Sequence, residues 1–592
     1  MKVLFIWTDA GTRLRPTSLH VGVAYLSATL KAAGHQTSLL RLYDFLSKDE
    51  FSRALDKETK PGLLAVSTMT SQFEYCKQLA TWAKEKWPEV PVIFGGHHPT
   101  LAPEEVIAVP AIDMLCRGEG EDAMLELVRV LEASKDISNI RNLWVKKDGQ
   151  VIKNEIRPLE KDLDEMPFMD LEIFHMEDLF KGCRMDVHFM AGRGCPYHCS
   201  YCCNPSVNRL YKGKGRVVRI RSVEKVLEEL KYHIRNHPRI EYITFADETL
   251  TLRKKWVFEF FPRYKKEIGL PFSSSVRVNT LDEDVIRVMA DAGCDLMRVG
   301  IESGSEWVRA NVMRRRMSNE QIIKAFDLIE KYGIRAGAFA MLGLPHETPE
   351  MIEETIAILR RCRPNDLQFT VFYPLPDTEL YEECKRKGFL TDERATSYFE
   401  PQLNLPTLTR EQILSYHKSC CDEFMKTASD KESGGYFNFL THLGEAEVES
   451  FDKKLVGPTV FVEEQPRRFV IQAHPPTKIV YHNIAVPADH VLDFDISMAP
   501  YTYDKEGGGV TFIIQIGRKV VFKHTLNPKR NAKDRGWHEF QVALKKFSGK
   551  TVDISFITTA ADNRYCTAGW GRPLLLPKDA SPFPKRYIVA AG

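Results

Sequence analysis

Three cysteines, Cys195, Cys199 and Cys202, follow one another at the spacing Cys-x3-Cys-x2-Cys. Three thiolates leave a four-iron cluster one ligand short, so its open iron can bind a substrate or cofactor. A structural zinc site would normally recruit a fourth Cys or His from a second paired spacing, and no such pair follows. A disulfide framework requires an oxidising compartment, of which there is no other sign. The spacing predicts an iron-sulfur site, beside which Cys203 is interpreted as a structural thiol.

Residues 192–203 around these cysteines resemble the signature of the radical S-adenosylmethionine (SAM) enzymes. The resemblance rests on the cysteine spacing, on Tyr201 just before the third cysteine and on the Gly-Arg-Gly lead-in. It implies that the open iron of a [4Fe-4S] cluster binds the amino and carboxylate groups of SAM. An electron from the cluster then cleaves SAM to a 5′-deoxyadenosyl radical, and Tyr201 is expected among the SAM contacts.

Length and composition describe a multidomain globular protein. The chain of 592 residues exceeds what one core usually supports, and its 43% hydrophobic and 27% charged residues are ordinary. A formal net charge of +2 gives no basic footprint for nucleic acid. The N-terminal apolar run is too short for a signal peptide, and no apolar run is long enough for a membrane span. Thirteen cysteines suggest reduced thiols, so we expect a cytoplasmic protein.

Residues 1–135 alternate short apolar runs with helical periodicity. Segments of ten or more helical residues separate the runs, which predicts a doubly wound parallel sheet. The predicted strands are 3–7, 37–42, 63–67, 91–94 and 114–116, and the predicted helices are 21–33, 76–87 and 122–133. In such a sheet, ligands bind beyond the carboxyl ends of the strands.

This order of elements resembles the cobalamin-binding domain that precedes the core of one radical SAM subfamily. Gly-Gly-His-His-Pro-Thr at 95–100 and Arg-Gly-Glu-Gly at 117–120 carry the resemblance. The subfamily includes cobalamin-dependent methyltransferases and the anaerobic magnesium-protoporphyrin ester cyclase. The cobalamin contacts that it implies are Ser67, Gly95, Gly96, His98, Gly118 and Glu119.

No Asp-x-His-x-x-Gly motif, which supplies a cobalt-ligating histidine in other cobalamin proteins, occurs here. His20 lies in Ser-Leu-His-Val-Gly, which does not match. His98 is therefore interpreted as a contact to the nucleotide tail of cobalamin, and alternatively as a satisfied turn histidine.

Residues 136–180 are expected to form a connector, with Asp-Gly between two alternating runs predicting a hairpin over 143–152. The alternation of strand and helix resumes over 181–385. Its predicted strands are 242–245, 272–279, 297–304, 336–345 and 367–373. The pattern resembles the partial (β/α) barrel of the radical SAM fold, whose polar residues gather at the strand ends.

The family resemblance also assigns SAM contacts at these strand ends. It places Asp247 and Glu248 against the SAM amino group, and Arg277 against the SAM carboxylate or the cobalamin side. Glu302 would contact the ribose hydroxyls or the methionine end, and the backbone around Leu344 would lie along adenine. For each residue alone, a structural salt bridge or a strand-end cap is the alternative.

The last part of the chain changes character. Residues 386–435 are helical and, by the resemblance, shape the substrate cavity. Residues 440–592 carry short alternating runs that predict an antiparallel, jelly-roll-like β-sandwich. Its Trp537 and Trp570 either stack on a sugar or belong to the core. Cys420 and Cys421 are interpreted as spare thiols, because adjacent cysteines chelate one metal poorly.

Taken together, the resemblance implies a cobalamin-dependent radical SAM enzyme that methylates an unactivated carbon. A cyclase or oxidoreductase with the same cofactors is the alternative. A tRNA-modifying methylthiotransferase would carry more N-terminal cysteines and a basic RNA-binding domain, and a cobalamin sensor would not need the cluster motif. The expected partners are a small-molecule, lipid or glycosylated substrate and an external flavodoxin- or ferredoxin-type electron donor, without nucleic acid.

Overall fold

The computed structural model describes residues 1–11, 18–180, 184–392, 394–433, 436–461, 468–503, 505–578 and 580. The chain divides into a larger unit, Met1–Leu179 with Met185–His417, and a smaller unit, Phe180–Arg184 with Lys418–Gly592. The end of the predicted sandwich, residues 581–592, lies outside the described residues.

The larger unit begins with a seven-stranded sheet in the order β2-β1-β3-β4-β5-β6-β7. Its strands are β1 (Lys2–Thr8), β2 (Gln36–Leu42), β3 (Leu63–Ser67), β4 (Val92–Gly95), β5 (Met114–Cys116), β6 (Leu143–Lys147) and β7 (Gln150–Lys153). The first five pair in parallel, as predicted. The hairpin β6-β7, which the sequence assigned to a connector, extends this sheet antiparallel to β5. The buried Leu143, Trp144 and Val145 of β6 explain why, since they need the cover of the sheet.

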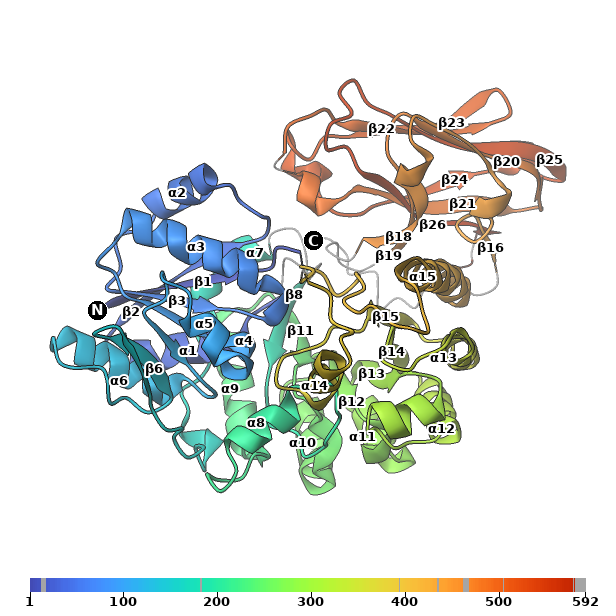
Figure 1. Cartoon of the computed structure of the whole chain (residues 1–592). Helices are drawn as coiled ribbons and strands as arrows, with labels where there is room; N and C mark the ends of the chain where they lie inside the picture. Colours follow the sequence, from blue (N-terminus) through green and yellow to red (C-terminus); the bar gives the residue numbers. More distant parts are fainter. Residues whose placement is uncertain are drawn as a thin grey trace. The chain divides into compact units, whose positions relative to one another are not determined.

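Helices cover both faces of this first sheet (Figure 1). They are α1 (Val21–Ala32), α2 (Lys48–Asp56), α3 (Phe73–Lys86), α4 (His97–Leu101), α5 (Pro103–Ile107) and α6 (Glu121–Glu132). Residues of α2, α3 and α5 share one apolar core with β1, β3 and β4. The sequence missed α4, because Gly-Gly-His-His-Pro-Thr is typical of a turn and the helix has only five residues.

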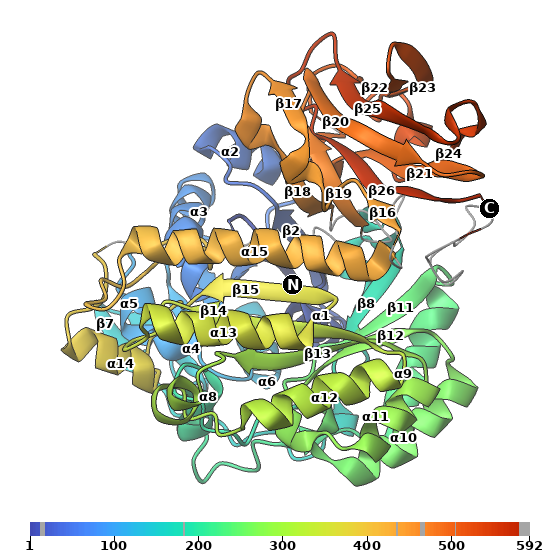
Figure 2. The ribbon, with the colours of Figure 1, turned by 90° about the vertical axis from the view of Figure 1, so that its right-hand side faces the viewer.

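The second sheet of this unit is the half-barrel that the sequence predicts. Its six strands pair in parallel in the order β15-β14-β13-β12-β11-β8. They are β8 (Met185–Phe189), β11 (Ile240–Phe245), β12 (Phe272–Val276), β13 (Cys294–Glu302), β14 (Arg335–Leu342) and β15 (Asp366–Val371). Figure 2 shows the helices α9 (Val223–Asn236), α10 (Lys254–Glu267), α11 (Glu283–Asp291), α12 (Asn319–Lys331) and α13 (Pro349–Cys362) outside the strands.

Further strands and helices belong to the larger unit. A short antiparallel pair of strands, β9 (Gly192–Arg193) with β10 (Arg219–Ile220), brackets the cysteine segment. The others are α7 (Met176–Leu179), α8 (Asn204–Leu210), α14 (Glu379–Arg386) and α15 (Arg410–Ser433), the last of which continues into the smaller unit. Among the helices that the structure describes, none has the length and apolar character to cross a bilayer.

The smaller unit is the predicted antiparallel sandwich. One sheet has the order β18-β19-β26-β21-β24, with β16 beside β26, and the other has the order β17-β20-β25-β22-β23. The strands are β16 (Phe437–Asn438), β17 (Glu447–Ser450), β18 (Val456–Phe461), β19 (Arg468–Ala473), β20 (Thr477–Val486), β21 (His490–Met498), β22 (Val510–Ile516), β23 (Lys519–Leu526), β24 (His538–Ala543), β25 (Lys550–Thr559) and β26 (Ala568–Pro577).

The two tryptophans considered as a sugar platform pack against protein. Trp570 is 0% exposed in the sandwich core, with its ring 5.1 Å from the rings of Phe512 and Phe556. Trp537 is half-buried, stacked on Phe461 at 5.9 Å and lying under the guanidinium of Arg468 at 5.1 Å. The structure therefore favours the core interpretation for Trp570.

We predict that Trp570→Ala lowers the free energy of unfolding of the sandwich by about 3–5 kcal/mol, because it opens a cavity in a packed core. Trp570→Phe is the matched control. It retains most of the apolar contact and removes an indole N–H that has no hydrogen-bond partner among the described residues. Scanning calorimetry of the full chain checks both variants. An unchanged transition for the alanine variant would contradict the core assignment.

Candidate active site

The lead-in to the three cysteines is fixed by one buried carboxylate. Asp247, just beyond β11, accepts hydrogen bonds from the backbone N–H groups of Ala191 at 3.0 Å and Gly192 at 2.7 Å. Burial raises the pKa of Asp247 to about 7, although these two donors act to lower it. The structure thus gives Asp247 backbone partners, whereas the resemblance assigned it to the SAM amino group.

The cysteine thiols lie among N–H donors. Arg277 directs Nη1 at Cys199 Sγ at 3.5 Å. The backbone and side-chain N–H groups of Asn204 lie 3.5 and 3.7 Å from Cys202 Sγ. Donors at this range stabilise thiolates, the form that binds iron. Among the described residues, no three His, Cys, Asp or Glu side chains converge on a point that one metal ion could fill.

Tyr201 and Glu302 meet beside the cysteines. Burial raises the pKa of Glu302, whereas the neighbouring Tyr201 and Arg315 act to lower it, and Arg315 Nη2 lies 3.7 Å from Glu302 Oε1. Glu302 ends β13 with φ +69°, a backbone conformation that non-glycine residues seldom adopt. Such strain clusters at functional sites. The structure therefore brings together Tyr201, Glu302 and Arg277, three of the residues predicted to contact SAM.

Glu248 and His97 remain solvent-accessible between the two sheets of the larger unit. Enclosure by protein lowers the pKa of His97, whereas the charges of Glu248 and Cys202 act to raise it. His97 begins α4, which packs beside α8, the helix that follows the cysteines. His97 therefore reaches from the first sheet toward the cysteine loop. The sequence pattern pointed to His98 instead.

One buried glutamate binds the backbone of the segment that is predicted to line adenine. Glu347 is 0% exposed and accepts the backbone N–H groups of Gly343 at 2.6 Å and Leu344 at 3.2 Å. The N–H of Leu344 is thus engaged by protein, and its side chain is buried. Sequence reasoning missed Glu347 because a glutamate in a Gly- and Pro-containing loop gives no sign of being buried.

The strand ends of the first sheet divide into open and occupied positions. A Cβ built on Gly95 meets no described atom within 4 Å. Gly96 adopts φ +98° and approaches Thr68 closely, so a side chain there would be strained. Ser67 Oγ bonds to His20 Nε2 at 2.9 Å, and His20 Nδ1 accepts the N–H of Val23. Both imidazole nitrogens of His20 are therefore engaged, which makes it a poor ligand for cobalt.

His98 is packed inside the first domain. Its side chain is 0% exposed, its ring centroid lies 4.3 Å from that of Phe73, and Nδ1 lies 3.3 Å from Thr70 Oγ1. Burial lowers the pKa of His98 to about 3, so the imidazole is neutral. This favours a packing role over a contact to the nucleotide tail, but His98 belongs to α4 and its buried Nε2 has no hydrogen-bond partner among the described residues, so it is not the satisfied turn histidine of the alternative.

Gly118 and Glu119 contact the half-barrel instead of an open face. The Glu119 N–H donates to the hydroxyl of Tyr211 at 2.7 Å, and its carboxylate pairs with Arg219. A Cβ on Gly118 would lie 2.0 Å from the same Tyr211 oxygen, so only glycine fits. Sequence reasoning missed Tyr211 and Arg219, which follow the cysteines in a stretch without periodicity.

The larger unit also contains two cavities, of which one reaches the cysteines. The smaller, about 330 Å³, reaches Cys199 and Cys202 and is bordered by Arg209, Lys212 and Arg314. The larger, about 610 Å³, has walls from the first domain and from the segment after β15. Its lining includes Glu74, Glu105, Tyr373, Tyr381, Asp392, Arg394 and Gln402.

Two family models match the chain in the order that the fold displays. The model of the B12 binding domain matches residues 11–128, and that of the radical SAM superfamily matches residues 190–359. An uncharacterized methyltransferase of Pyrococcus horikoshii is 30% identical over 423 residues, which cover 70% of this chain and 90% of the relative. The anaerobic magnesium-protoporphyrin IX monomethyl ester cyclase of Rubrivivax gelatinosus is 26% identical over 70% of this chain and 75% of its own.

Solved structures agree on the fold. The radical SAM methyltransferase TsrM of Kitasatospora setae superposes with a TM-score of 0.53 at 17% identity, covering 65% of this chain and 76% of that chain. The cobalamin-dependent radical enzyme OxsB gives a TM-score of 0.50 at 18% identity, over 64% of this chain and 54% of that chain.

The chain is an enzyme of the radical SAM superfamily. It belongs to the branch in which a B12-binding domain precedes the radical SAM core, as the sequence predicted. Its cofactors are a [4Fe-4S] cluster, SAM and cobalamin. The residues present fit these groups, since N–H donors face two of the three thiols and the backbone beside Gly95 is open.

We predict that Glu347 makes stability depend on pH. Burial raises the pKa of Glu347 to about 8, whereas the pKa of a glutamate in an unfolded chain is about 4.3. Between these values the folded state binds the extra proton, so the free energy of unfolding falls as pH rises, by roughly 1.4 kcal/mol per pH unit at most. Glu347→Gln keeps an oxygen acceptor and removes this dependence.

Thermal unfolding of both proteins from pH 5 to pH 9 checks the prediction. The glutamine variant should gain stability relative to the original chain as pH rises. A constant difference between the two would show that Glu347 does not titrate in this range.

Proposed function

We propose that this enzyme methylates an unactivated carbon of its substrate. The observation that supports the proposal most is that the open glycine turn at Gly95 and the cysteine loop belong to one compact unit, with His97 reaching between them. Relatives named as methyltransferases support it too, among them the cytidylyl-2-hydroxyethylphosphonate methyltransferase of Streptomyces wedmorensis, 24% identical over 66% of this chain and 82% of its own. Relatives named as cyclases keep ring formation as the alternative.

The overall reaction balances with two SAM molecules and two electrons. One SAM yields methionine and 5′-deoxyadenosine, which takes the substrate hydrogen, and the other yields S-adenosylhomocysteine as its methyl group replaces that hydrogen. When bound, the cluster supplies the reducing electron and cobalamin carries the methyl group. The residues of the chain supply binding, orientation and exclusion of water.

The roles of the chain's own residues follow from the contacts. Asp247 fixes the approach of the cysteine loop, and Arg277 and Asn204 stabilise the thiolates of Cys199 and Cys202. Glu248, exposed at its strand end, is suited to pair with the SAM ammonium. Glu302, held by Tyr201 and Arg315, is suited to accept ribose hydroxyls.

We assign the substrate to the larger cavity. Its volume of about 610 Å³ lies within the range of small-molecule sites. Part of its wall comes from residues 390–402, in the region that the resemblance connects with the substrate. Its carboxylate, guanidinium and amide groups favour a polar small molecule over a lipid.

The proposal predicts two products that can be separated. Cluster-reconstituted protein with SAM and dithionite should form 5′-deoxyadenosine, and Cys199→Ala should reduce this to background because it removes an iron ligand. Cys203→Ala, which alters the adjacent thiol, is the matched control and should retain the cluster. Anaerobic chromatography of the products provides the measurement.

Adding cobalamin separates methylation from its rival. S-Adenosylhomocysteine that appears only with cobalamin supports methylation. Deoxyadenosine that is indifferent to cobalamin would exclude methylation and favour the cyclase-like alternative.

The smaller cavity suits an acidic electron carrier. It reaches two of the cysteines, and its border carries Lys212, Arg209 and Arg314, of which the two arginines also pair with Asp377 and Glu379. Complementary charge speeds the encounter of protein partners. We therefore place the docking site of a flavodoxin or ferredoxin here.

Free thiols at every cysteine of the described residues fit a reducing cytoplasm.

Charge reversal tests this docking site. Lys212→Glu should slow reduction of the cluster by reduced flavodoxin about tenfold at low salt, because it removes an exposed positive charge. Reduction by dithionite should stay unchanged, and Lys255→Glu on the outer helix α10 is the matched control. Stopped-flow absorbance measures both. Equal slowing with both reductants would contradict the assignment.

A further inference from the structure

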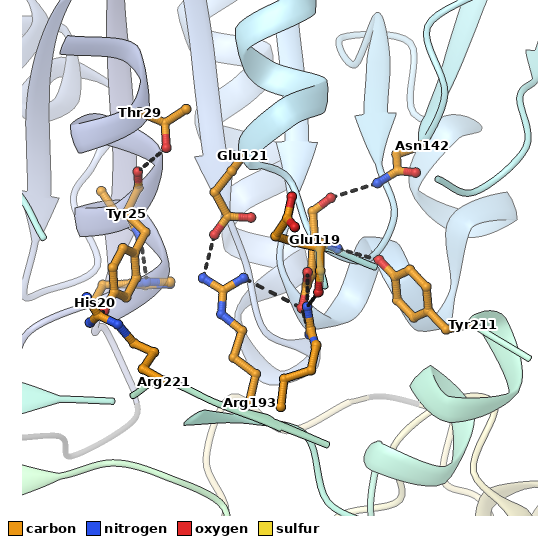
Figure 3. Close-up of polar contacts among 12 residues, drawn as sticks. His20, Tyr25, Thr29, Glu119, Glu121, Asn142, Arg193, Tyr211 and Arg221 are labelled. Carbon is orange, nitrogen blue, oxygen red and sulfur yellow. Dashed lines mark hydrogen bonds and ion pairs between the residues drawn. The ribbon is translucent and has the colours of Figure 1, made fainter. Parts of the chain in front are cut away.

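Two sequence motifs that were each expected to contact cofactors bind one another. The Arg-Gly-Glu-Gly turn at 117–120 follows β5 of the B12-binding domain, and the Gly-Arg-Gly lead-in at 192–194 precedes the cysteines. Figure 3 shows Glu119 and Glu121 of the first domain facing Arg193. The contact joins the two cofactor-binding domains at a point directly connected to the cysteine loop.

Several ion pairs form this contact, and their side chains are largely shielded from solvent. Arg193 Nη2 donates to Glu121 Oε1 at 2.6 Å, and Nη1 lies 3.6 Å from Glu119 Oε1. Arg219 Nη1 donates to Glu119 Oε2 at 3.1 Å, and its Nη2 contacts the other oxygen of the same carboxylate. Arg193 belongs to β9 and Arg219 belongs to β10, the paired strands on either side of the cysteine segment. Both ends of the cysteine segment are thus tied to the B12-binding domain.

A second layer extends this contact into both domains. Tyr25 of α1 lies under the Arg193 guanidinium at 5.4 Å, and its hydroxyl accepts Arg221 Nη1 at 3.2 Å. Arg221 in turn pairs with Glu229 of α9, a carboxylate that is 0% exposed. Arg221 follows β10 directly, so the network is continuous from α1 to the helical layer of the half-barrel.

Shape complementarity accompanies the charges. The Tyr211 hydroxyl occupies the position where any side chain at residue 118 would begin, and it accepts the Glu119 N–H. Asn142 Nδ2 donates to the Glu119 carbonyl at 2.7 Å. The turn is therefore held by backbone contacts as well as by its carboxylates, which leaves it little freedom to shift.

The free energy of buried ion pairs indicates that these contacts fix the geometry of the two domains more than they add stability. Burying charged pairs costs desolvation that the attraction between them often only offsets, so such pairs are weak evidence for stability. They do specify register, because any displaced arrangement leaves a charge without its partner. Five charged or polar side chains at one contact, namely Glu119, Glu121, Arg193, Arg219 and Tyr211, meet this description.

We propose that these five residues are positioning residues that set the distance between the cobalamin face and the cluster. We define them as the interdomain clamp. The inference rests on the proposed function, since methyl transfer requires SAM at the cluster and cobalamin to be in register. A misplacement of about 1 Å between reacting groups can cost a hundredfold in rate.

The test uses the full chain with Glu119→Gln and Glu121→Gln combined, which removes the charges and preserves side-chain shape. The matched control is Glu126→Gln on the same helix α6, whose carboxylate pairs with Arg157 instead of a half-barrel residue. 5′-Deoxyadenosine and S-adenosylhomocysteine are measured in reactions that contain SAM, cobalamin and a chemical reductant but no substrate. Hydrogen exchange of residues 116–121 and 211–221 is followed in the cofactor-free chain.

The clamp predicts that cobalamin-dependent S-adenosylhomocysteine falls about tenfold or more while 5′-deoxyadenosine stays within about twofold. Exchange in both segments should become faster, and the Glu126 variant should match the original chain. Equal loss of both products, or unchanged exchange, would overturn the clamp. If the original chain forms 5′-deoxyadenosine but no cobalamin-dependent S-adenosylhomocysteine, the proposed methylation is refuted. Hydrogen exchange alone then decides whether the clamp exists.

Discussion

The hydrogen bonds of the Asp247 carboxylate to the backbone of Ala191 and Gly192 carry much of this architecture. The carboxylate is buried at a cost that raises its pKa, and the two N–H donors offset part of that cost. Because Asp247 directly follows β11, which pairs with both β8 and β12, the cysteine loop takes its position from the sheet. Arg277 and the B12-binding domain therefore contact a cysteine loop whose position the half-barrel sets.

What the sequence could predict follows from the range of each interaction. The three cysteines stand within eight positions of one another, and the strand ends are marked by local apolar runs, so both were predictable. The role of Glu119 was not, because its partners Tyr211 and Arg219 lie 92 and 100 positions away. Gly118 gave a real signal, a glycine that a close contact requires, but the sequence could not reveal that the contact is a tyrosine.

Neighbouring residues illustrate the same limit at short range. His97 and His98 are chemically identical, yet one is solvent-accessible near Glu248 and the other is 0% exposed against Phe73. Their difference arises from α4, a helix too short to leave a periodic pattern. In the hairpin β6-β7 the reverse applies. The turn signal was local and correct, while its place in the first sheet depended on distant pairing with β5.

The distribution of satisfied polar groups separates scaffold from site. Asp247, His20 and Glu119 each have protein partners that use their hydrogen-bonding atoms, and Glu347 holds two backbone N–H groups through Oε2, so these residues hold the loops in place. Glu248 and His97 are solvent-accessible between the two domains, and Glu302 is held at a strained backbone angle. Polar groups that a fold positions precisely and leaves accessible are those that a ligand can complete. The scaffold residues therefore make the geometry, and the accessible ones face the place where the chemistry occurs.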